Sequence, residues 1–511
     1  MPELWKNLIL AKEIIKKNFF LHLIVLLFVL FNVINLSNTS LIDWDEGVFA
    51  SQGKWLATAG AEGKAFNFQT PPLFQTLVAT FFKLLTPKDY FLPLLSIIFS
   101  CLTIYLIFFL TTTLYSKREG IYAVIIFVTT EFFFFFSKSG LSDSTFLFFF
   151  TAAVFFFVKG IRFNKTNYFL LTGLFSALAL YTKYSAFSLL VMFLLAGYLY
   201  RKDINKKWFA FSIMLPIVLF SPYLYIFIKF VQIPGISTRY IGLLGINHAK
   251  FLYYLLSLAP IPFLFSIIHI IRSLKNLKKW DILILLFSGT FFVILGFYYH
   301  YFRLAYPLVP FLSIIASRFV IQTGKYKLYV LTGSVIIALL LSLNTICYKS
   351  DVPKRLSIVV DDYSQKENIK YAYAVVPPNI YFYIKGKIAV PADHPWARIG
   401  RKFPHIYKNA KIIHRDNNEL LAENKILLIH ATIFDSLKQK NIALYNRGML
   451  LHSIEFKDAP VYYKDIYNRE RDVKQIYEIY LFDSKSLGAK IDNLWDLGFN
   501  RQVTVIQRPS K

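Results

Sequence analysis

The stretch FFLHLIVLLFVLFNVINL, residues Phe19–Leu36, is long and apolar enough to cross a membrane as one helix. Lys16 and Lys17 precede it, and the acidic run DWDEG, residues Asp43–Gly47, follows it closely. The apolar stretch lacks the small-residue cleavage site of a removed signal peptide, so we interpret it as a membrane anchor. Carboxylates kept at a membrane boundary usually serve function, although a solvated acidic loop is the simpler alternative.

The composition of the whole chain is typical of a polytopic membrane protein. Of its 511 residues, 56% are hydrophobic and 18% aromatic, whereas a soluble globular protein is about 45–50% apolar. The net charge of +27 could suggest a nucleic-acid partner. However, Lys and Arg recur in short clusters between apolar runs, as topology signals do, so we expect no nucleic-acid binding. The two cysteines, Cys101 and Cys347, do not suggest a disulfide framework.

The basic clusters predict a topology. With the N-terminus in the cytoplasm, the strongly basic loops all fall on the inner side: 117–118, 159–165, 201–207, 272–279 and 318–327. The apolar runs between them give about eleven transmembrane helices, of which the last lies near Leu328–Ile346. We therefore predict an all-α transmembrane domain over residues 1–346, with an extracytoplasmic first loop at 37–88.

Residues 347–511 are predicted to form a soluble extracytoplasmic α/β domain. This part is charged and has no membrane-length apolar run. The segments that read as strands are Tyr371–Val376, Ile388–Val390, Lys425–His430 and Ile476–Phe482. The segments between them that read as helices are Asn379–Ile384 and Thr432–Lys440. Such alternation favours an α/β sheet.

In this topology, the polar residues at the outer ends of the spans gather on one face. They are Asp43, Asp45, Glu46, Asp143, Lys183, Arg239, His248, His300 and Arg303. A carboxylate can take a proton from an acceptor hydroxyl, and Arg or Lys can hold a phosphate leaving group. The outer face therefore suits a reaction on an anionic substrate held in the membrane.

Several of these residues also have a simpler interpretation. Asp143 could only cap the helix that follows it. Lys183 could extend to the interface from between two apolar spans, and Arg303 could only anchor its span. His248 and His300 are more often packing residues than ligands, so we assign them no role.

The segment that follows the acidic motif predicts a further helix. Thr70 and two prolines would start it, since proline is tolerated in a first helical turn. Apolar residues then recur at helical spacing: Leu73, Leu77, Phe81 and Leu84. We expect an amphipathic helix on the outer membrane surface, with a short buried helix as the alternative.

These motifs, in this order, resemble those of a known superfamily. They are Asp45-Glu46, Pro71-Pro72-Leu73, Ser142-Asp143, Tyr181-Thr182-Lys183, and Arg303 with Tyr306-Pro307. Over roughly residues 1–345 the chain resembles the protein O-mannosyltransferase and aminoarabinose-transferase superfamily. The resemblance implies the C-type glycosyltransferase fold and a sugar donor linked to polyprenyl phosphate.

The resemblance also implies roles for individual residues. Asp45 matches the acidic residue that acts as base or orients the acceptor, Glu46 is its neighbour, and Asp143 matches a second acidic position. These three form the predicted catalytic set. The predicted substrate-binding set comprises Asp43, Lys183, Arg239, Arg303 and Tyr306, with Arg303 near the lipid phosphate. A divalent metal stays an open alternative, with Asp45 and Asp143 as its candidate ligands.

The chain departs from the aminoarabinose transferases before its double proline. It carries Gln69-Thr70 where those enzymes carry a Glu-Lys pair. This difference argues against lipid A as acceptor and leaves the wider superfamily standing.

We predict a glycosyltransferase of the plasma (inner) membrane. It would move a sugar from a polyprenyl-phosphate donor to a lipid, glycan or protein acceptor on the extracytoplasmic face. No nucleotide-binding glycine loop occurs in the sequence. The alternatives are a transporter or flippase, a glycan polymerase or ligase for lipid-linked saccharides, and a membrane anchor for the C-terminal domain. A transporter would keep polar residues near the bilayer midplane, whereas here the charges gather at one face.

Overall fold

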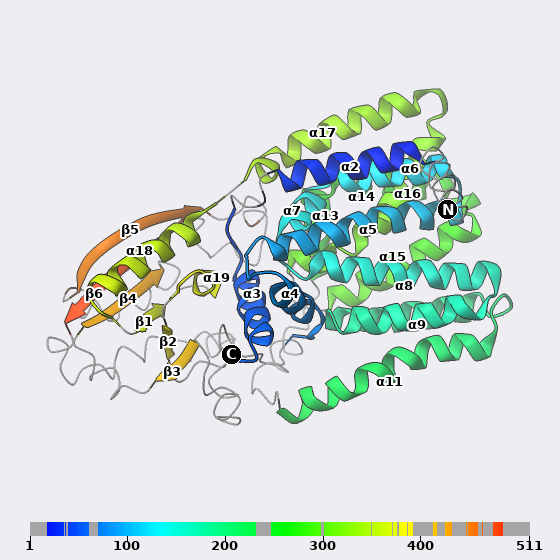
Figure 1. The fold of residues 1–511 in the computed structure, drawn as a ribbon. Coiled ribbons are helices and arrows are strands. Elements are labelled where there is room, and N and C mark those ends of the chain that lie inside the picture. The colour runs from blue at the N-terminus through cyan, green and yellow to red at the C-terminus, as the bar shows by residue number, and fades with distance from the viewer. Residues whose placement is uncertain are drawn as a thin grey trace, which may run out of the picture.

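The chain forms a bundle of long apolar helices with a small sheet domain at one end (Figure 1). This computed structural model describes residues 18–34, 36, 39–60, 70–230, 247–297, 301–348, 350–369, 371–375, 378–385, 387–391, 412–415, 425–431, 446, 448–457, 462 and 474–483. Helices α3 (Trp44–Ala57) and α4 (Leu73–Leu84) lie between the bundle and the sheet domain.

The described helices of the bundle are α2 (Phe19–Val33), α5 (Phe91–Leu114), α6 (Lys117–Val128), α7 (Glu131–Lys138), α8 (Asp143–Phe163), α9 (Thr166–Leu180), α10 (Phe187–Leu199), α11 (Lys206–Phe230), α13 (His248–Leu258), α14 (Pro260–Ser273), α15 (Lys279–Gly296), α16 (Leu308–Gln322) and α17 (Lys327–Cys347). Short 3-10 turns link some of them: η2 (Tyr184–Ala186), η3 (Leu274–Asn276), η4 (Phe302–Ala305) and η5 (Gly324–Tyr326).

Within the described residues, five helices are long and apolar enough to cross a membrane: α5, α8, α11, α15 and α17. Two bent pairs, α6–α7 and α13–α14, raise the number to seven if each pair is one span. The remaining predicted spans correspond to apolar helices of 10–17 residues. The chain therefore has the multi-helix membrane architecture expected, and the number of about eleven spans stays a prediction.

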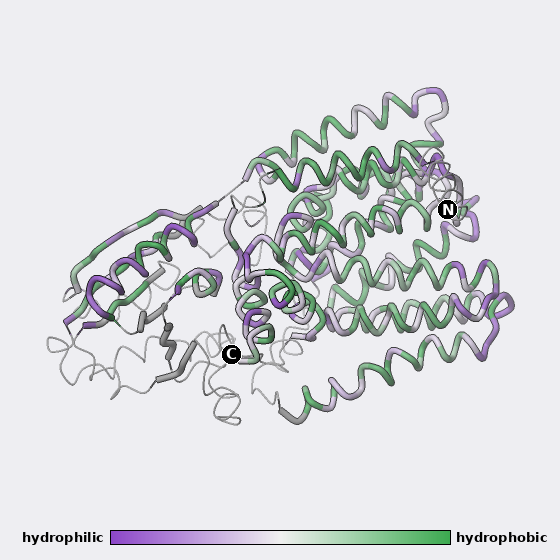
Figure 2. Tube along the Cα trace, in the orientation of Figure 1, coloured by the Kyte–Doolittle hydropathy of each residue, from purple (hydrophilic) through white to green (hydrophobic). Residues whose placement is uncertain are grey.

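The hydrophilic turns of the bundle gather at the end far from the sheet domain (Figure 2). This arrangement agrees with the basic clusters sharing one side of the membrane. At that end Arg318 contacts Glu119 and lies 3.6 Å from Asp281. Tyr115 donates a 2.6 Å hydrogen bond to the same Asp281 carboxylate. These contacts join the ends of α5, α6, α15 and α16. They stabilise the bundle, because a charge left unpaired in this buried position would cost several kcal/mol.

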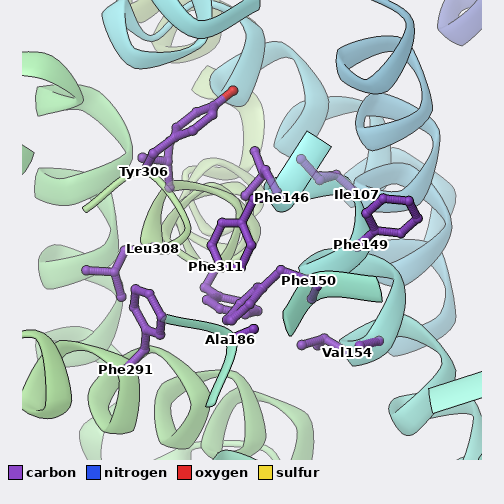
Figure 3. Packing of buried hydrophobic residues seen from close by; sticks show 14 of the residues in the cluster. Ile107, Phe146, Phe149, Phe150, Val154, Ala186, Phe291, Tyr306, Leu308 and Phe311 are labelled. Atoms are coloured by element: carbon purple, nitrogen blue, oxygen red, sulfur yellow. The ribbon is translucent and has the colours of Figure 1, made fainter. Parts of the chain in front are cut away.

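Phenylalanine side chains fill the centre of the bundle (Figure 3). Phe150 of α8 packs edge-on against Phe291 of α15, and it also lies near Phe311 of α16, with ring centroids 5.3 and 6.2 Å apart. Aromatic pairs at such distances add roughly 0.5–1.5 kcal/mol each beyond the area that they bury. Tyr306 lies at the edge of this cluster with its hydroxyl directed away from it (Figure 3). The core thereby fixes the ends of the helices that carry the charged residues.

The amphipathic helix predicted after the double proline is present as α4. Its Phe74, Val78 and Phe82 side chains are buried. The predicted stripe that begins at Leu73 lies on the more exposed side, where Leu84 is 77% exposed. Contact of this stripe with the membrane surface stays a prediction.

The described C-terminal part forms a six-stranded sheet in the order β3-β2-β1-β4-β6-β5. Its elements are α18 (Val352–Lys366), β1 (Tyr371–Val375), α19 (Pro378–Tyr381), β2 (Lys387–Pro391), β3 (Ile412–Arg415), β4 (Lys425–Ala431), β5 (Met449–Lys457) and β6 (Lys474–Asp483). Strands β3, β2, β1 and β4 run parallel, and β6 and β5 pair antiparallel. We call these elements and the segments between them the C-terminal domain.

Four strands occur where the sequence predicts them, at β1, β2, β4 and β6, and α19 overlaps the predicted helix at Asn379–Ile384. Helix α18 and strands β3 and β5 were not predicted. The predicted helix Thr432–Lys440 lies outside the described residues. The extracytoplasmic location of this domain stays a prediction.

Candidate active site

The acidic motif forms the N-terminus of α3. Asp43 is the N-cap residue, and its Oδ1 accepts a 2.7 Å hydrogen bond from the backbone N–H of Asp45. Glu46 Oε2 accepts from the backbone N–H groups of Ile42 (2.6 Å) and Asp43 (3.0 Å). This is a capping box, which satisfies backbone donors that have no partner inside the helix. The Asp45 side chain takes no part in the capping and is 44% exposed.

Glu46 also joins the motif to the second acidic segment. Its Oε1 accepts a hydrogen bond from the backbone N–H of Gly140, in the turn before α8. A Cβ at Gly140 would lie 2.7 Å from Leu92 Cβ, so only glycine allows this close approach. Burial and the neighbouring Asp43 raise the pKa of Glu46 to about 7. These contacts favour a structural role for Glu46, and its catalytic role stays a prediction.

Arg303 lies at the centre of the site, in η4. Its Nη1 donates to Asp45 Oδ2 at 2.6 Å, and its Nη2 and Nε donate to Asp143 Oδ2 at 2.7 and 3.0 Å. Asp43 Oδ1 is 4.0 Å from the same Nη1. Arginine suits this position because its planar fork can reach several oxygens at once. The side chain is only 4% exposed, so the pairs are held away from bulk water.

Lys183 completes the group from the turn after α9. Its Nζ lies 2.5 Å from Asp143 Oδ1, so each oxygen of Asp143 contacts a cation. Burial lowers the pKa of Lys183, while Asp143 acts in the opposite direction. We call Asp43, Asp45, Asp143, Lys183 and Arg303 the Arg303 cluster. Its three carboxylates and two cations leave one negative charge uncompensated when all five are ionised.

Aromatic side chains surround the Arg303 cluster. Tyr462, from the C-terminal domain, donates a hydrogen bond to Asp43 Oδ2. Its ring meets Phe135 and Phe302 edge-on at 5.6 and 5.7 Å. The Tyr301 ring centre lies 5.5 Å from the guanidinium carbon of Arg303. Burial, followed by the Asp45 charge, raises the pKa of Asp43 above its ordinary value.

The structure thus brings together most of the residues that the sequence singled out. Tyr306 lies beneath the cluster, 1% exposed and stacked on Phe136 at 4.7 Å. Arg239 and His300 lie outside the described residues. His248 packs against Phe292 and Phe297, away from the cluster, as its simpler interpretation suggested.

Tyr301 and Tyr462 were not singled out from the sequence. Tyr301 adjoins Arg303, and this adjacency was an available signal. Tyr462 lies 419 residues from its partner Asp43, in a segment without a motif. The capping box was readable from Asp43 and Glu46, which stand three positions apart before a helix.

Asp45 and Asp143, the two candidate metal ligands, both contact Arg303. Over the ranges that the structure describes, no group of three or more His, Cys, Asp or Glu residues is placed to hold a metal ion.

The bundle has an acidic first loop, and two later cations lie beside its charges: Arg303 contacts Asp45 of that loop and Asp143, and Lys183 contacts Asp143. Residues 69–226 match the family model described as dolichyl-phosphate-mannose-protein mannosyltransferase. No curated protein matches the chain by sequence.

Solved structures share this fold. One is ArnT from Cupriavidus metallidurans bound to undecaprenyl phosphate, with a TM-score of 0.65 and 12% identity over 90% of this chain and 98% of that chain. Another is the oligosaccharyltransferase AglB of Archaeoglobus fulgidus, in complex with an inhibitory peptide and a dolichol-phosphate. Its TM-score is 0.52, with 11% identity over 84% of this chain and 71% of that chain.

These findings confirm the predicted resemblance and the C-type fold. The family match also supports the prediction of a membrane glycosyltransferase, which the resemblance carried.

Proposed function

We propose that this protein transfers a sugar from a polyprenyl-phosphate carrier to an acceptor hydroxyl at the end of the bundle that bears the C-terminal domain. In the predicted topology this is the outer face of the plasma (inner) membrane, with the N-terminus in the cytoplasm. The observation that carries the proposal is the Arg303 cluster, in which one buried guanidinium joins an exposed carboxylate to a buried one. The ArnT and AglB structures, which hold undecaprenyl phosphate and a dolichol-phosphate, support the choice of donor.

The cations of the cluster would hold the donor phosphate. Arg303, in η4, and Lys183, in the turn after α9, contact the two oxygens of the same Asp143 carboxylate, so a phosphate bound beside them would meet both cations. Charge-assisted hydrogen bonds from a fork of this kind are the strong ones. A phosphate that takes Nη1 of Arg303 displaces the Asp45 carboxylate from it, and Asp45 then becomes available to the acceptor.

Asp45 would act as the general base. It is the most exposed carboxylate of the cluster, at 44% compared with 8% for Asp43 and 2% for Asp143. The acceptor oxygen attacks the anomeric carbon and its proton passes to Asp45, while the bond between that carbon and the phosphate oxygen breaks. The sugar is then joined to the acceptor, and the departing polyprenyl phosphate carries the electron pair. Arg303 and Lys183 stabilise its charge.

One observation favours the flippase alternative. The bends of α6–α7 and α13–α14 line a small cavity together with α17, and the buried Glu131 lies at its wall. Paired broken helices with an ionisable residue occur in transporters. Glu131 accepts a 2.6 Å hydrogen bond from Thr345 of α17, a contact that also serves to hold the bend. The flippase alternative predicts movement of a labelled polyprenyl-phosphate sugar across vesicles without transfer.

A donor panel tests the proposal. Purified protein in lipid vesicles is incubated with undecaprenyl phosphate carrying radiolabelled mannose, glucose, galactose or aminoarabinose, together with membrane extracts as acceptors. We expect transfer of label from at least one of these donors, with release of undecaprenyl phosphate. Nucleotide-linked forms of the same sugars are the matched control and should give no transfer. Transfer from a nucleotide sugar, or from none of the lipid-linked donors, would overturn the proposal.

A further inference from the structure

The C-terminal domain holds the segment that leads into the acidic motif. The Tyr383 hydroxyl accepts a 2.7 Å hydrogen bond from the backbone N–H of Leu41. The same hydroxyl donates at 2.7 Å to Asp89, just before α5. Asn379 Nδ2 donates to the Leu41 carbonyl at 3.1 Å. Both backbone groups of Leu41 are therefore bound by side chains of the C-terminal domain.

The start of the C-terminal domain, and Ser350 just before it, add further contacts to this segment. Lys354 of α18 pairs with Asp89 at 2.9 Å and donates to the Thr39 carbonyl at 2.6 Å. The N–H and the hydroxyl of Ser40 both donate to the Ser350 carbonyl, each at 2.8 Å. The three successive residues Thr39, Ser40 and Leu41, before α3, are thus hydrogen-bonded to the C-terminal domain or to Ser350 next to it. Helix α19 also lies beside α3 (Figure 1).

Tyr462 extends this hold into the Arg303 cluster. One oxygen of Asp43 accepts from Tyr462, and the other accepts from the backbone N–H of Asp45. Asp43 Oδ1 is also 4.0 Å from Arg303 Nη1, the nitrogen that contacts Asp45 at 2.6 Å. If the Asp43 carboxylate turned, it would compete with Asp45 for that nitrogen. The hydroxyl of Tyr462 opposes this turn.

We propose that the C-terminal domain sets the geometry of the active site, with Tyr462 acting through Asp43, and Tyr383 through Leu41, as positioning residues for Asp45. The proposal rests on the proposed function, since Asp45 is the base only in a sugar transfer of this kind. Neither tyrosine needs to touch substrate. The domain is then a part of the catalytic unit, and not a separate binding module on a membrane anchor.

The test removes single hydroxyls from the full-length protein. Tyr462→Phe keeps the ring against Phe135 and Phe302 and removes the donor to Asp43. Tyr383→Phe removes the acceptor of the Leu41 N–H. Tyr480→Phe is the matched control, because Tyr480 is a buried tyrosine of the same domain whose hydroxyl donates at 2.9 Å to Glu478 of the same strand, β6.

Two readouts are taken on each protein. The first is kcat and KM for the best undecaprenyl-phosphate sugar of the donor panel, and the second is backbone hydrogen exchange over residues 39–50. We expect Tyr462→Phe and Tyr383→Phe to lower kcat about 10- to 100-fold with little change in KM, since small misplacements of a catalytic group cost up to ~10²-fold. Exchange over 39–50 should be faster in both variants, and Tyr480→Phe should behave like the wild type.

Normal kcat and normal exchange in Tyr462→Phe and Tyr383→Phe would overturn the proposal. An equal loss of activity in Tyr480→Phe would overturn it as well, because the effect would then be one of domain stability. A wild-type protein that transfers no sugar would refute the proposed function alone. The exchange readout needs no substrate, and unchanged exchange in both variants would separately refute the coupling of the C-terminal domain to the acidic motif.

Discussion

Replacing Arg303 by lysine keeps the positive charge and removes the fork. Arg303 donates one hydrogen bond to Asp45 (2.6 Å) and two to Asp143 (2.7 and 3.0 Å), and a single ammonium cannot reproduce this geometry. A hydrogen bond to a charged group is worth about 1.5–3 kcal/mol. Loss of one such bond to a bound phosphate should therefore weaken the affinity for undecaprenyl phosphate roughly 10- to 100-fold. Arg303→Ala should weaken it further.

The affinity is measured on monodisperse protein in detergent, together with the thermal unfolding temperature. Arg318→Lys is the control, because Arg318 is a mostly buried arginine that faces two carboxylates, Glu119 and Asp281, at the opposite end of the bundle. It should lose stability and bind undecaprenyl phosphate normally. If Arg303→Lys binds the lipid like the wild type, or if Arg318→Lys loses as much affinity, Arg303 is only a structural anchor.

Three further predictions concern stability, pH and topology. Asp143→Asn removes the buried carboxylate that Lys183 and Arg303 share, and it should lower the unfolding free energy by about 3–5 kcal/mol, measured by thermal unfolding. The pKa of Glu46 is about 7 in the folded protein, against an ordinary value of 4.5. The unfolding free energy of the wild type should therefore fall by about 3 kcal/mol as the pH rises from 4.5 to 7, and Glu46→Gln should remove this pH dependence. In intact cells, an impermeant thiol reagent should label a cysteine at the exposed Lys366 and not one at the exposed Asn205.

The membrane part of the fold could be predicted because its signals are local. Apolar runs such as Phe91–Leu114 need no knowledge of their neighbours to be recognised as helices. The bends in α6–α7 and α13–α14 were not predicted, although Pro260 follows the second break. In the C-terminal domain, β3 covers only Ile412–Arg415, and four residues are too few to show the alternation of apolar and polar side chains that indicates a strand.

The candidate site could be predicted only as a set of residues on one face. The residues placed Asp45, Asp143, Lys183 and Arg303 on the same side of the membrane, and only the family resemblance pointed to Asp45 as the base; the charge pattern alone could not state which carboxylate is free to react. That distinction comes from local backbone bonding, because capping commits Asp43 and Glu46 to the start of α3 and leaves Asp45 outward. The contact of Tyr462 with Asp43 depends on tertiary folding across most of the chain, for which no local pattern exists.

The rate of sugar transfer by Asp45→Asn tests the central claim most directly. The variant keeps the size of the side chain and removes the base. Asp203→Asn is the control, since Asp203 is 45% exposed and pairs with Lys279 at the same 2.6 Å distance, away from the site. With undecaprenyl-phosphate sugar as donor, we predict that Asp45→Asn transfers about 10²–10⁴-fold more slowly and still binds undecaprenyl phosphate, while Asp203→Asn is normal. Near-normal turnover by Asp45→Asn would contradict the account.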